Sequence, residues 1–207
     1  MADERLFIAL ELPDYVLEAL TKLQKQLQAL DSGRVIRWTG IDSVHLTLKF
    51  IGETSADRKP DIVAALSVAA QPIAPFDLSL QGVGCFPDLR RPRIVWAGCA
   101  GDVSTLHSLR DAVEHTVAPM GYPTEDRPFS PHLTLGRARQ EARRDTLQSF
   151  GERISKLEVG ALTMWRVEGM SLMRSELRPS GAIYSRQAYI AFVRTSSEDQ
   201  PRSKTAT

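Results

Sequence analysis

Two stretches of four residues decide the fold: His45-Leu46-Thr47-Leu48 and His132-Leu133-Thr134-Leu135. In each, apolar and polar residues alternate, which is typical of a strand with one buried face and one open face. Because residues i and i+2 of a strand point to the same side, each histidine should share a face with its threonine. One such match arises by chance in about one chain in a hundred of this length, and two far more rarely. The repeat therefore indicates duplication with a shared role.

The first copy lies in a longer alternating run. Its polar residues are expected to line a cleft, and by this parity Lys49 should lie beside His45 and Thr47. Its apolar residues are expected to face a core: Val44, Leu46, Leu48 and Phe50. In the second copy, Leu133 and Leu135 should point inward in the same way.

The order of elements repeats as well. The patterns predict helices over 13–30, 60–71, 102–118 and 141–150, and strands over 6–12, 35–39, 44–51, 76–86, 93–97, 132–135, 166–176 and 182–193. Ile8 precedes His45 by 37 residues, and Val95 precedes His132 by the same number. We therefore expect an α+β fold of two pseudo-symmetric lobes, with antiparallel sheets lining a central cleft and helices outside. A single bilobal domain should span 1–194, and 195–207 lack an apolar pattern and are predicted to be a disordered tail.

The composition is that of an ordinary globular protein, with 207 residues, 43% of them hydrophobic and 25% charged. The net charge of +1 gives no strong field toward nucleic acid or membrane, so any nucleic-acid contact must be local. Cys85 and Cys99 have neither disulfide nor metal-site spacing and are expected to be small buried residues. No basic leader and no apolar run of about 20 residues is present, so we expect a cytoplasmic monomer.

Two imidazoles and two hydroxyls facing one another can perform acid–base chemistry on a phosphate. An imidazole has an unperturbed pKa near 6.5, so one ring can act as general base and the other as general acid. Threonine hydroxyls can donate to phosphate oxygens. No Asp, Glu or Cys stands at ligand spacing beside either histidine, and no Gly-x-Ser-x-Gly occurs. Neither a metal, a cofactor nor a serine nucleophile is therefore expected.

The chain resembles the two-histidine phosphoesterases, and within them the LigT-like (ThpR) RNA 2′,3′-cyclic phosphodiesterases. The resemblance rests on both motifs, on Arg5 to Leu10 (RLFIAL), and on the stretches 49–53 (KFIGE) and 131–137 (PHLTLGR), and it covers about 5–193. It implies hydrolysis of a 2′,3′-cyclic phosphate at an RNA end to a 2′-phosphomonoester. It also implies that His45 is the proton donor, that His132 is the proton acceptor, and that Thr47 and Thr134 bind the phosphate.

Further site residues are less clearly marked. Arg137 lies five residues after His132, so in a straight strand it would point away, although a bulge at Gly136 could re-aim it. It is either a phosphate contact, which the resemblance favours, or a surface arginine. The candidates for stacking on a base are aromatic: Trp38, Phe50, Tyr122 and Phe129. Parity favours a core position for Phe50, and His107 and His115 are expected on the surface.

Two other readings stay open beside the cyclic phosphodiesterase. The same chemistry could serve another substrate, such as a nucleotide cyclic phosphate, a 2′–5′ oligoadenylate, a U-tailed RNA, or a 2′–5′ linkage that is joined or cleaved. A non-catalytic module that binds RNA ends is the third reading, and the intact histidines and threonines of both copies argue against it.

Overall fold

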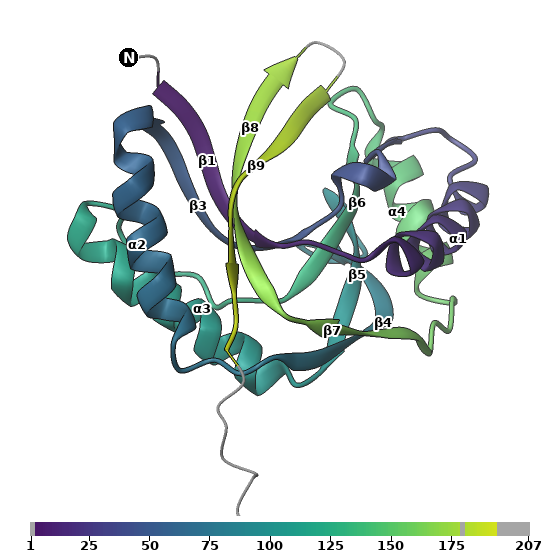
Figure 1. Cartoon of the computed structure of the whole chain (residues 1–207). Coiled ribbons are helices and arrows are strands. Elements are labelled where there is room, and N and C mark those ends of the chain that lie inside the picture. Colours follow the sequence, from purple (N-terminus) through teal and green to yellow (C-terminus); the bar gives the residue numbers. More distant parts are fainter. Residues whose placement is uncertain (1–2, 179–180, 194–207) are drawn as a thin grey trace, which may run out of the picture.

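The computed structural model describes residues 3–178 and 181–193. Two antiparallel sheets stand side by side, with helices on their outer sides (Figure 1). The first sheet has the order β3-β1-β8-β9, from Leu46–Ser55, Asp3–Leu10, Gly169–Arg178 and Gly181–Ala191. The second has the order β2-β6-β5-β4-β7, from Ile36–Trp38, His132–Ala138, Ile94–Gly101, Phe76–Phe86 and Ala161–Val167. The predicted α+β fold with two lobes is confirmed.

Each lobe contains two of the four α-helices found in the described residues. Helices α2 (Lys59–Ala70) and α3 (Val103–Val117) cover the first sheet, and α1 (Asp14–Leu30) and α4 (Arg144–Ile154) cover the second. Helix α1 forms because apolar residues recur every three or four positions, and Val16, Leu20, Leu23 and Leu27 are buried against the sheet. The helices leave the opposite face of each sheet uncovered, and we call these two faces the inner faces.

The two halves of the sequence do not coincide with the two lobes. Within each half, the strand that precedes the motif pairs antiparallel with the motif strand: β1 with β3, and β5 with β6. The closing strands cross over, however. β4 from the first half pairs with β5, and β8 from the second half pairs with β1, so each sheet is built from both halves. The duplication is therefore interleaved, which ties the lobes together.

Most predicted elements are present, with shifted ends. The hairpins β4–β5 and β8–β9 form as expected. β7 is a separate edge strand that begins at Ala161, whereas the sequence patterns place no strand between 151 and 165. Helix α4 begins at Arg144 rather than 141 and ends later, at Ile154. The turn residues 179–180 and the predicted tail at 195–207 lie outside the described residues. Within the described chain, no helix has both the length and the apolar character needed to span a membrane.

Candidate active site

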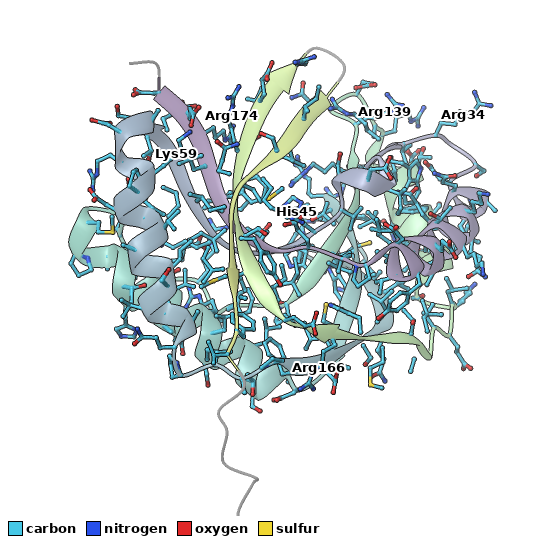
Figure 2. The ribbon with its side chains drawn as sticks, in the orientation of Figure 1. Arg34, His45, Lys59, Arg139, Arg166 and Arg174 are labelled. Atoms are coloured by element: carbon cyan, nitrogen blue, oxygen red, sulfur yellow. The ribbon has the colours of Figure 1, made fainter. Side chains whose placement is uncertain are left out.

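The two motif strands belong to different sheets and approach each other in space. Cα atoms of β3 and β6 come within 8 Å of one another. The ring centroid of His45 lies 4.7 Å from that of Phe7 and 5.0 Å from that of Tyr184, on the inner face of the first sheet (Figure 2). The ring of His132 lies 4.9 Å from Phe86 on the inner face of the second. Each histidine is half-buried against an aromatic wall of its own lobe.

Both imidazoles are held in the same tautomer by the same local device. The Nδ1 of His45 lies 2.9 Å from the carbonyl oxygen of Ser43, and the Nδ1 of His132 lies 2.7 Å from that of Ser130. A carbonyl can only accept, so Nδ1 carries the hydrogen in each ring. The Nε2 atom is then free in both histidines to take or give a proton. The carbonyl two residues upstream therefore prepares both rings for acid–base chemistry.

Each threonine shares the inner face with its histidine, as the alternation predicts. Thr47 lies opposite Ala9, a member of the inner apolar cluster with Phe7 and Tyr184. Thr134 lies opposite Trp96, whose ring packs 5.3 Å from Phe86. Directly opposed residues of an antiparallel pair point to the same side.

The alternation fails immediately after each threonine, because both strands carry a bulge at the last residue of the motif. Pairing skips Leu48 in β3 and Leu135 in β6. A bulge inserts one residue and inverts the facing of the residues that follow. The predicted facings of Lys49 and Phe50 are consequently wrong. Lys49 is buried on the helix side, and Phe50 is 57% exposed on the inner face, opposite Phe7.

The bulge in β6 also decides where Arg137 points. Arg137 lies opposite Ile94, and Thr134 lies opposite Trp96, two residues further along a regular stretch of β5. Arg137 and Thr134 therefore share the inner face, where Arg137 is exposed. The bulged carbonyl of Leu135 accepts from Gln24 Nε2 at 3.0 Å and from the Thr39 N–H at 2.9 Å. Gln24 went unnoticed in the sequence, although its polar side chain lies on the apolar stripe of α1.

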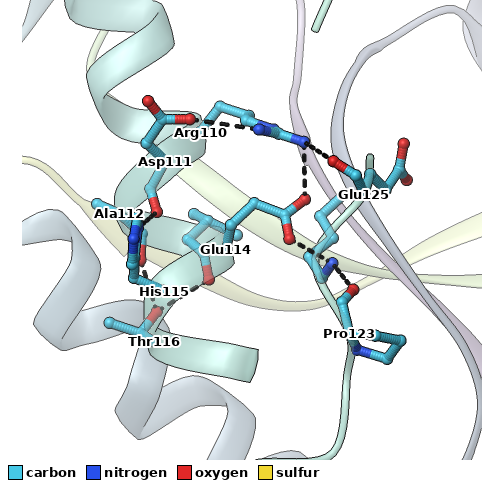
Figure 3. A network of polar contacts seen from close by, with 10 residues as sticks. Arg110, Asp111, Ala112, Glu114, His115, Thr116, Pro123 and Glu125 are labelled. Carbon is cyan, nitrogen blue, oxygen red and sulfur yellow. Dashed lines mark hydrogen bonds and ion pairs between the residues drawn. The ribbon is translucent and has the colours of Figure 1, made fainter. Parts of the chain in front are cut away.

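Lys49 connects the first motif strand to the segment that leads into the second motif, through contacts with Glu114 and Pro123, both labelled in Figure 3. Lys49 Nζ lies 2.6 Å from a carboxylate oxygen of Glu114 on α3 and donates to the carbonyl of Pro123 at 2.8 Å. Arg110 contacts the other Glu114 oxygen at 3.2 Å. The Lys49 and Glu114 side chains are only 2% and 3% exposed, so each charge depends on the other.

The charges near the two histidines are opposite. Burial lowers the pKa of both rings, and the hydrogen bonds to Ser43 and Ser130 act in the other direction. Beyond these effects, the carboxylate of Glu11 raises the pKa of His45, whereas the guanidinium of Arg137 lowers that of His132. The neighbouring charges thus act in opposite directions: Glu11 favours the imidazolium of His45, and Arg137 favours the neutral ring of His132.

Glu11 is itself held as an anion. Its carboxylate accepts from Ser171 and accepts two hydrogen bonds from Arg186, at 2.7 and 2.8 Å. Burial opposes ionisation, but these contacts hold the pKa of Glu11 below its usual range. The sequence signal for Glu11 is a charged residue inside the apolar run 6–12, and it was overlooked.

Three predicted stacking residues lie elsewhere. Trp38 is opposite Gly136 and packs 6.3 Å from Phe150 of α4, on the outer side of the sheet. Tyr122 lies under the guanidinium of Arg58, and Phe129 packs against α3 through Arg110. The structure thus brings only Phe50, of the four aromatic candidates, to an inner face.

The remaining polar candidates are placed as follows. His107 and His115 are exposed, as predicted. Cys85 is buried and Cys99 is half-buried, and burial raises the pKa of each thiol to about 12. Over residues 3–178 and 181–193, no three side chains of the His, Cys, Asp or Glu type gather as a metal site would require.

The chain is similar to known proteins over most of its length. The family model for LigT-like phosphoesterases matches residues 10–96 and 100–184. A protein of Methanothermobacter thermautotrophicus named RNA 2′,3′-cyclic phosphodiesterase is 31% identical, with 87% of this chain and 95% of its own covered. A protein of the same name from Thermus thermophilus is 36% identical, with 87% and 86% covered.

Solved structures share the fold. A crystal structure of a Thermus thermophilus protein superposes with a TM-score of 0.74 at 30% identity, covering 91% of this chain and 97% of that one. Escherichia coli LigT gives a TM-score of 0.73 at 24% identity, covering 93% and 99%, which shows the likeness of fold alone. With the family match extending over most of the chain and both motifs in place, this protein belongs to the LigT-like phosphoesterases.

Proposed function

We propose that this enzyme hydrolyses the 2′,3′-cyclic phosphate at the end of an RNA to a 2′-phosphomonoester. The relatives named above are called RNA 2′,3′-cyclic phosphodiesterases, which supports the cyclic phosphate as substrate. One observation carries the proposal: two Nδ1-protonated histidines on facing strands, one beside a carboxylate and the other beside a guanidinium. A hydrolysis that needs one acid and one base requires that difference.

The proposed steps assign one proton transfer to each histidine. His132 Nε2 accepts a proton from a water as its oxygen bonds to phosphorus. The bond from phosphorus to the ribose 3′ oxygen breaks, and His45 gives its Nε2 proton to that oxygen. Thr47, Thr134 and Arg137 bind the phosphate oxygens, where negative charge develops. The reaction leaves His132 protonated and His45 neutral, and proton exchange with solvent restores the starting states before the next turnover.

Phe50 is proposed as the surface on which a base of the substrate stacks. Its ring is exposed beside Phe7 on the same inner face as His45. Unpaired bases of RNA are commonly bound by stacking on aromatic side chains. We do not extend this role to Trp38, whose ring packs on the outer side of its sheet.

The decisive experiment identifies the product. Cytidine 2′,3′-cyclic phosphate and an RNA with a cyclic end are incubated with the enzyme, and products are compared with authentic 2′- and 3′-monophosphates by phosphorus NMR. The 2′-phosphate is expected. A dominant 3′-phosphate would reverse the assignment of acid and base, and a joined 2′–5′ RNA product without hydrolysis would favour ligation instead.

Activity is expected to survive EDTA followed by extensive dialysis, because neither motif histidine has a ligand set for a divalent ion around it among the residues that the structure describes. The measurement compares kcat/KM before and after treatment. Loss of turnover, restored by one added divalent ion, would contradict a mechanism carried by the two histidines alone.

A further inference from the structure

Two arginines lie directly opposite each other on neighbouring strands at the edge of the second sheet. Arg37 in β2 is the register partner of Arg137 in β6, and both side chains are exposed. Like charges in direct opposition destabilise an antiparallel pair. Among the residues that the structure describes, neither guanidinium has an acidic partner within ion-pair distance. An anion between them would remove this repulsion, which makes the pair a candidate anion site.

Arg139 is a third arginine along the same edge, after Arg37 and Arg137. Its N–H donates to the carbonyl of Val35 at 2.8 Å, which continues the backbone pairing of β2 and β6 one residue beyond the end of β6. Its Nε donates to the carbonyl of Arg34 at 3.1 Å, and this contact fixes the guanidinium while leaving its terminal nitrogens exposed. Figure 2 shows Arg34 and Arg139 close together at the upper end of the second lobe.

Three cations near the first sheet are paired with carboxylates. Arg186 is bound to Glu11, and Lys59 and Arg174 both pair with Glu4, at 2.8 and 3.3 Å. Arg139 has only a marginal contact with Glu141, at 4.0 Å. Arg37 and Arg139 thus add positive charge beside the guanidinium of Arg137, which acts on His132, and among the described residues the 4.0 Å contact of Arg139 is the one acidic contact that either of them makes.

We infer that Arg37 and Arg139 bind the sugar–phosphate backbone of an RNA strand whose cyclic end lies at the two histidines. The inference rests on the proposed function and adds that the substrate is an RNA chain and not a single nucleotide. The guanidinium fork matches phosphate oxygens in a bidentate manner. Arg137 contacts the terminal phosphate, and the arginines continue from it across β2, so the strand leaves the catalytic site along this edge.

The test compares two substrates with one set of variants. The ratio kcat/KM is measured for cytidine 2′,3′-cyclic phosphate and for an RNA of about six residues with a cyclic end, at salt concentrations from about 50 to about 200 mM. Arg37→Gln, Arg139→Gln and the double variant should lose activity on the RNA alone. Each lost phosphate contact should reduce the slope of log kcat/KM against log salt by about 0.7, or about threefold over this roughly fourfold range of salt.

Arg166→Gln is the matched control. Arg166 is 45% exposed against 46% for Arg139, and the substitution changes the net charge equally, but the residue lies in β7 at the far edge of the same sheet. If Arg166→Gln and Arg139→Gln changed the salt slope equally, the change in overall net charge would explain both effects, and the inference would be overturned. Equal losses on the RNA and on the nucleotide would place these arginines at the terminal phosphate or in the fold, which overturns it too.

A binding assay separates this inference from the proposed function. Fluorescence anisotropy of the same RNA, labelled at its 5′ end, requires no turnover. If the native enzyme hydrolyses neither substrate, the proposed hydrolysis fails. Weaker RNA binding by the double variant would then still support backbone binding by Arg37 and Arg139. Unchanged RNA binding and unchanged RNA hydrolysis in the double variant would overturn the inference while leaving the hydrolysis of the nucleotide intact.

Discussion

Positions 50 and 137 are equivalent in the two lobes and differ completely in chemistry. Each lies three residues beyond the motif threonine, and each is brought to the inner face by a bulge at the last leucine of the motif. At the first position stands an aromatic ring packed on Phe7, and at the second a guanidinium beside His132. The backbone device was therefore kept in both copies while the side chain that it presents diverged.

This divergence explains how a symmetric pair of histidines can perform an asymmetric reaction. The tautomers are identical, because Ser43 and Ser130 supply the same carbonyl contact. The charges that surround the rings are different, with Glu11 near His45 and Arg137 near His132. A carboxylate favours the imidazolium, and a guanidinium favours the neutral ring. The proposed assignment of acid to the first lobe and base to the second draws on these neighbouring charges, because the two motifs are identical.

Removing either histidine is the largest test of this comparison. His45→Ala and His132→Ala should each lower kcat by about 10²- to 10⁴-fold, because each removes one of the two proton transfers. The surviving limb of the pH profile should differ: the His45 variant loses the alkaline limb, and the His132 variant loses the acidic one. Circular dichroism controls for folding. Near-full turnover in either variant would contradict a mechanism in which both act.

The second test concerns the contact that holds the two motifs in a fixed relation. Lys49→Met leaves Glu114 buried with only Arg110 beside it, and loss of one member of a buried pair costs about 3–5 kcal/mol of the free energy of unfolding. Urea unfolding measures it. The control is Lys59→Met, whose pair with Glu4 is more exposed, at 27% and 16%, and which should cost about 1 kcal/mol or less. If both variants lost the same free energy of unfolding, the buried pair of Lys49 and Glu114 would contribute no more than the more exposed pair of Lys59 and Glu4.

A third test separates the two equivalent positions. Phe50→Ala should weaken RNA binding by about 1–3 kcal/mol through lost stacking, with little effect on folding because the ring is exposed. Inorganic phosphate has no base, so its inhibition constant should be unchanged in Phe50→Ala and should rise in Arg137→Gln. A rise in Phe50→Ala alone would exchange the roles proposed for these residues.

The sequence was sufficient for the fold and for the two motifs, since both depend on periodicity. Alternation over 44–48 and 132–135 placed each threonine on the face of its histidine, and the pairing bears this out. The sequence did not predict the facing of the residues that follow each motif. A bulge leaves no trace in the apolar pattern of Leu48-Lys49-Phe50, so Lys49 and Phe50 were assigned to the wrong sides. Only Gly136 hinted at the equivalent bulge in β6.

The sequence also could not predict that each sheet contains strands from both halves of the chain. The equal spacing of 37 residues revealed the duplication, but the pairing of β8 with β1 joins strands from opposite ends of the chain. Such long-range choices depend on which edge completes a sheet, and local propensity does not encode them. The same applies to Glu11 and Arg186, whose pairing becomes visible only once β1 and β9 lie in one sheet.

The smallest and most specific effect is expected in the pH dependence. Burial lowers the pKa of both histidines, so the maximum of kcat/KM should lie below the ordinary value of about 6.5. Glu11→Gln removes a charge that raises the pKa of His45, and the alkaline limb should move to lower pH. Arg137→Gln removes a charge that lowers the pKa of His132, and the acidic limb should move to higher pH. Both variants therefore narrow the pH profile, Glu11→Gln from the alkaline side and Arg137→Gln from the acidic side. The apparent pKa of each limb belongs to His45 and His132 as a coupled pair. Profiles of kcat/KM for the nucleotide substrate measure this, with Glu141→Gln as a control that removes an exposed carboxylate with no resolved effect on the pKa of either histidine. If Glu11→Gln moved the acidic limb instead, Glu11 would be acting on the base, and the assignment of the two histidines would have to be exchanged.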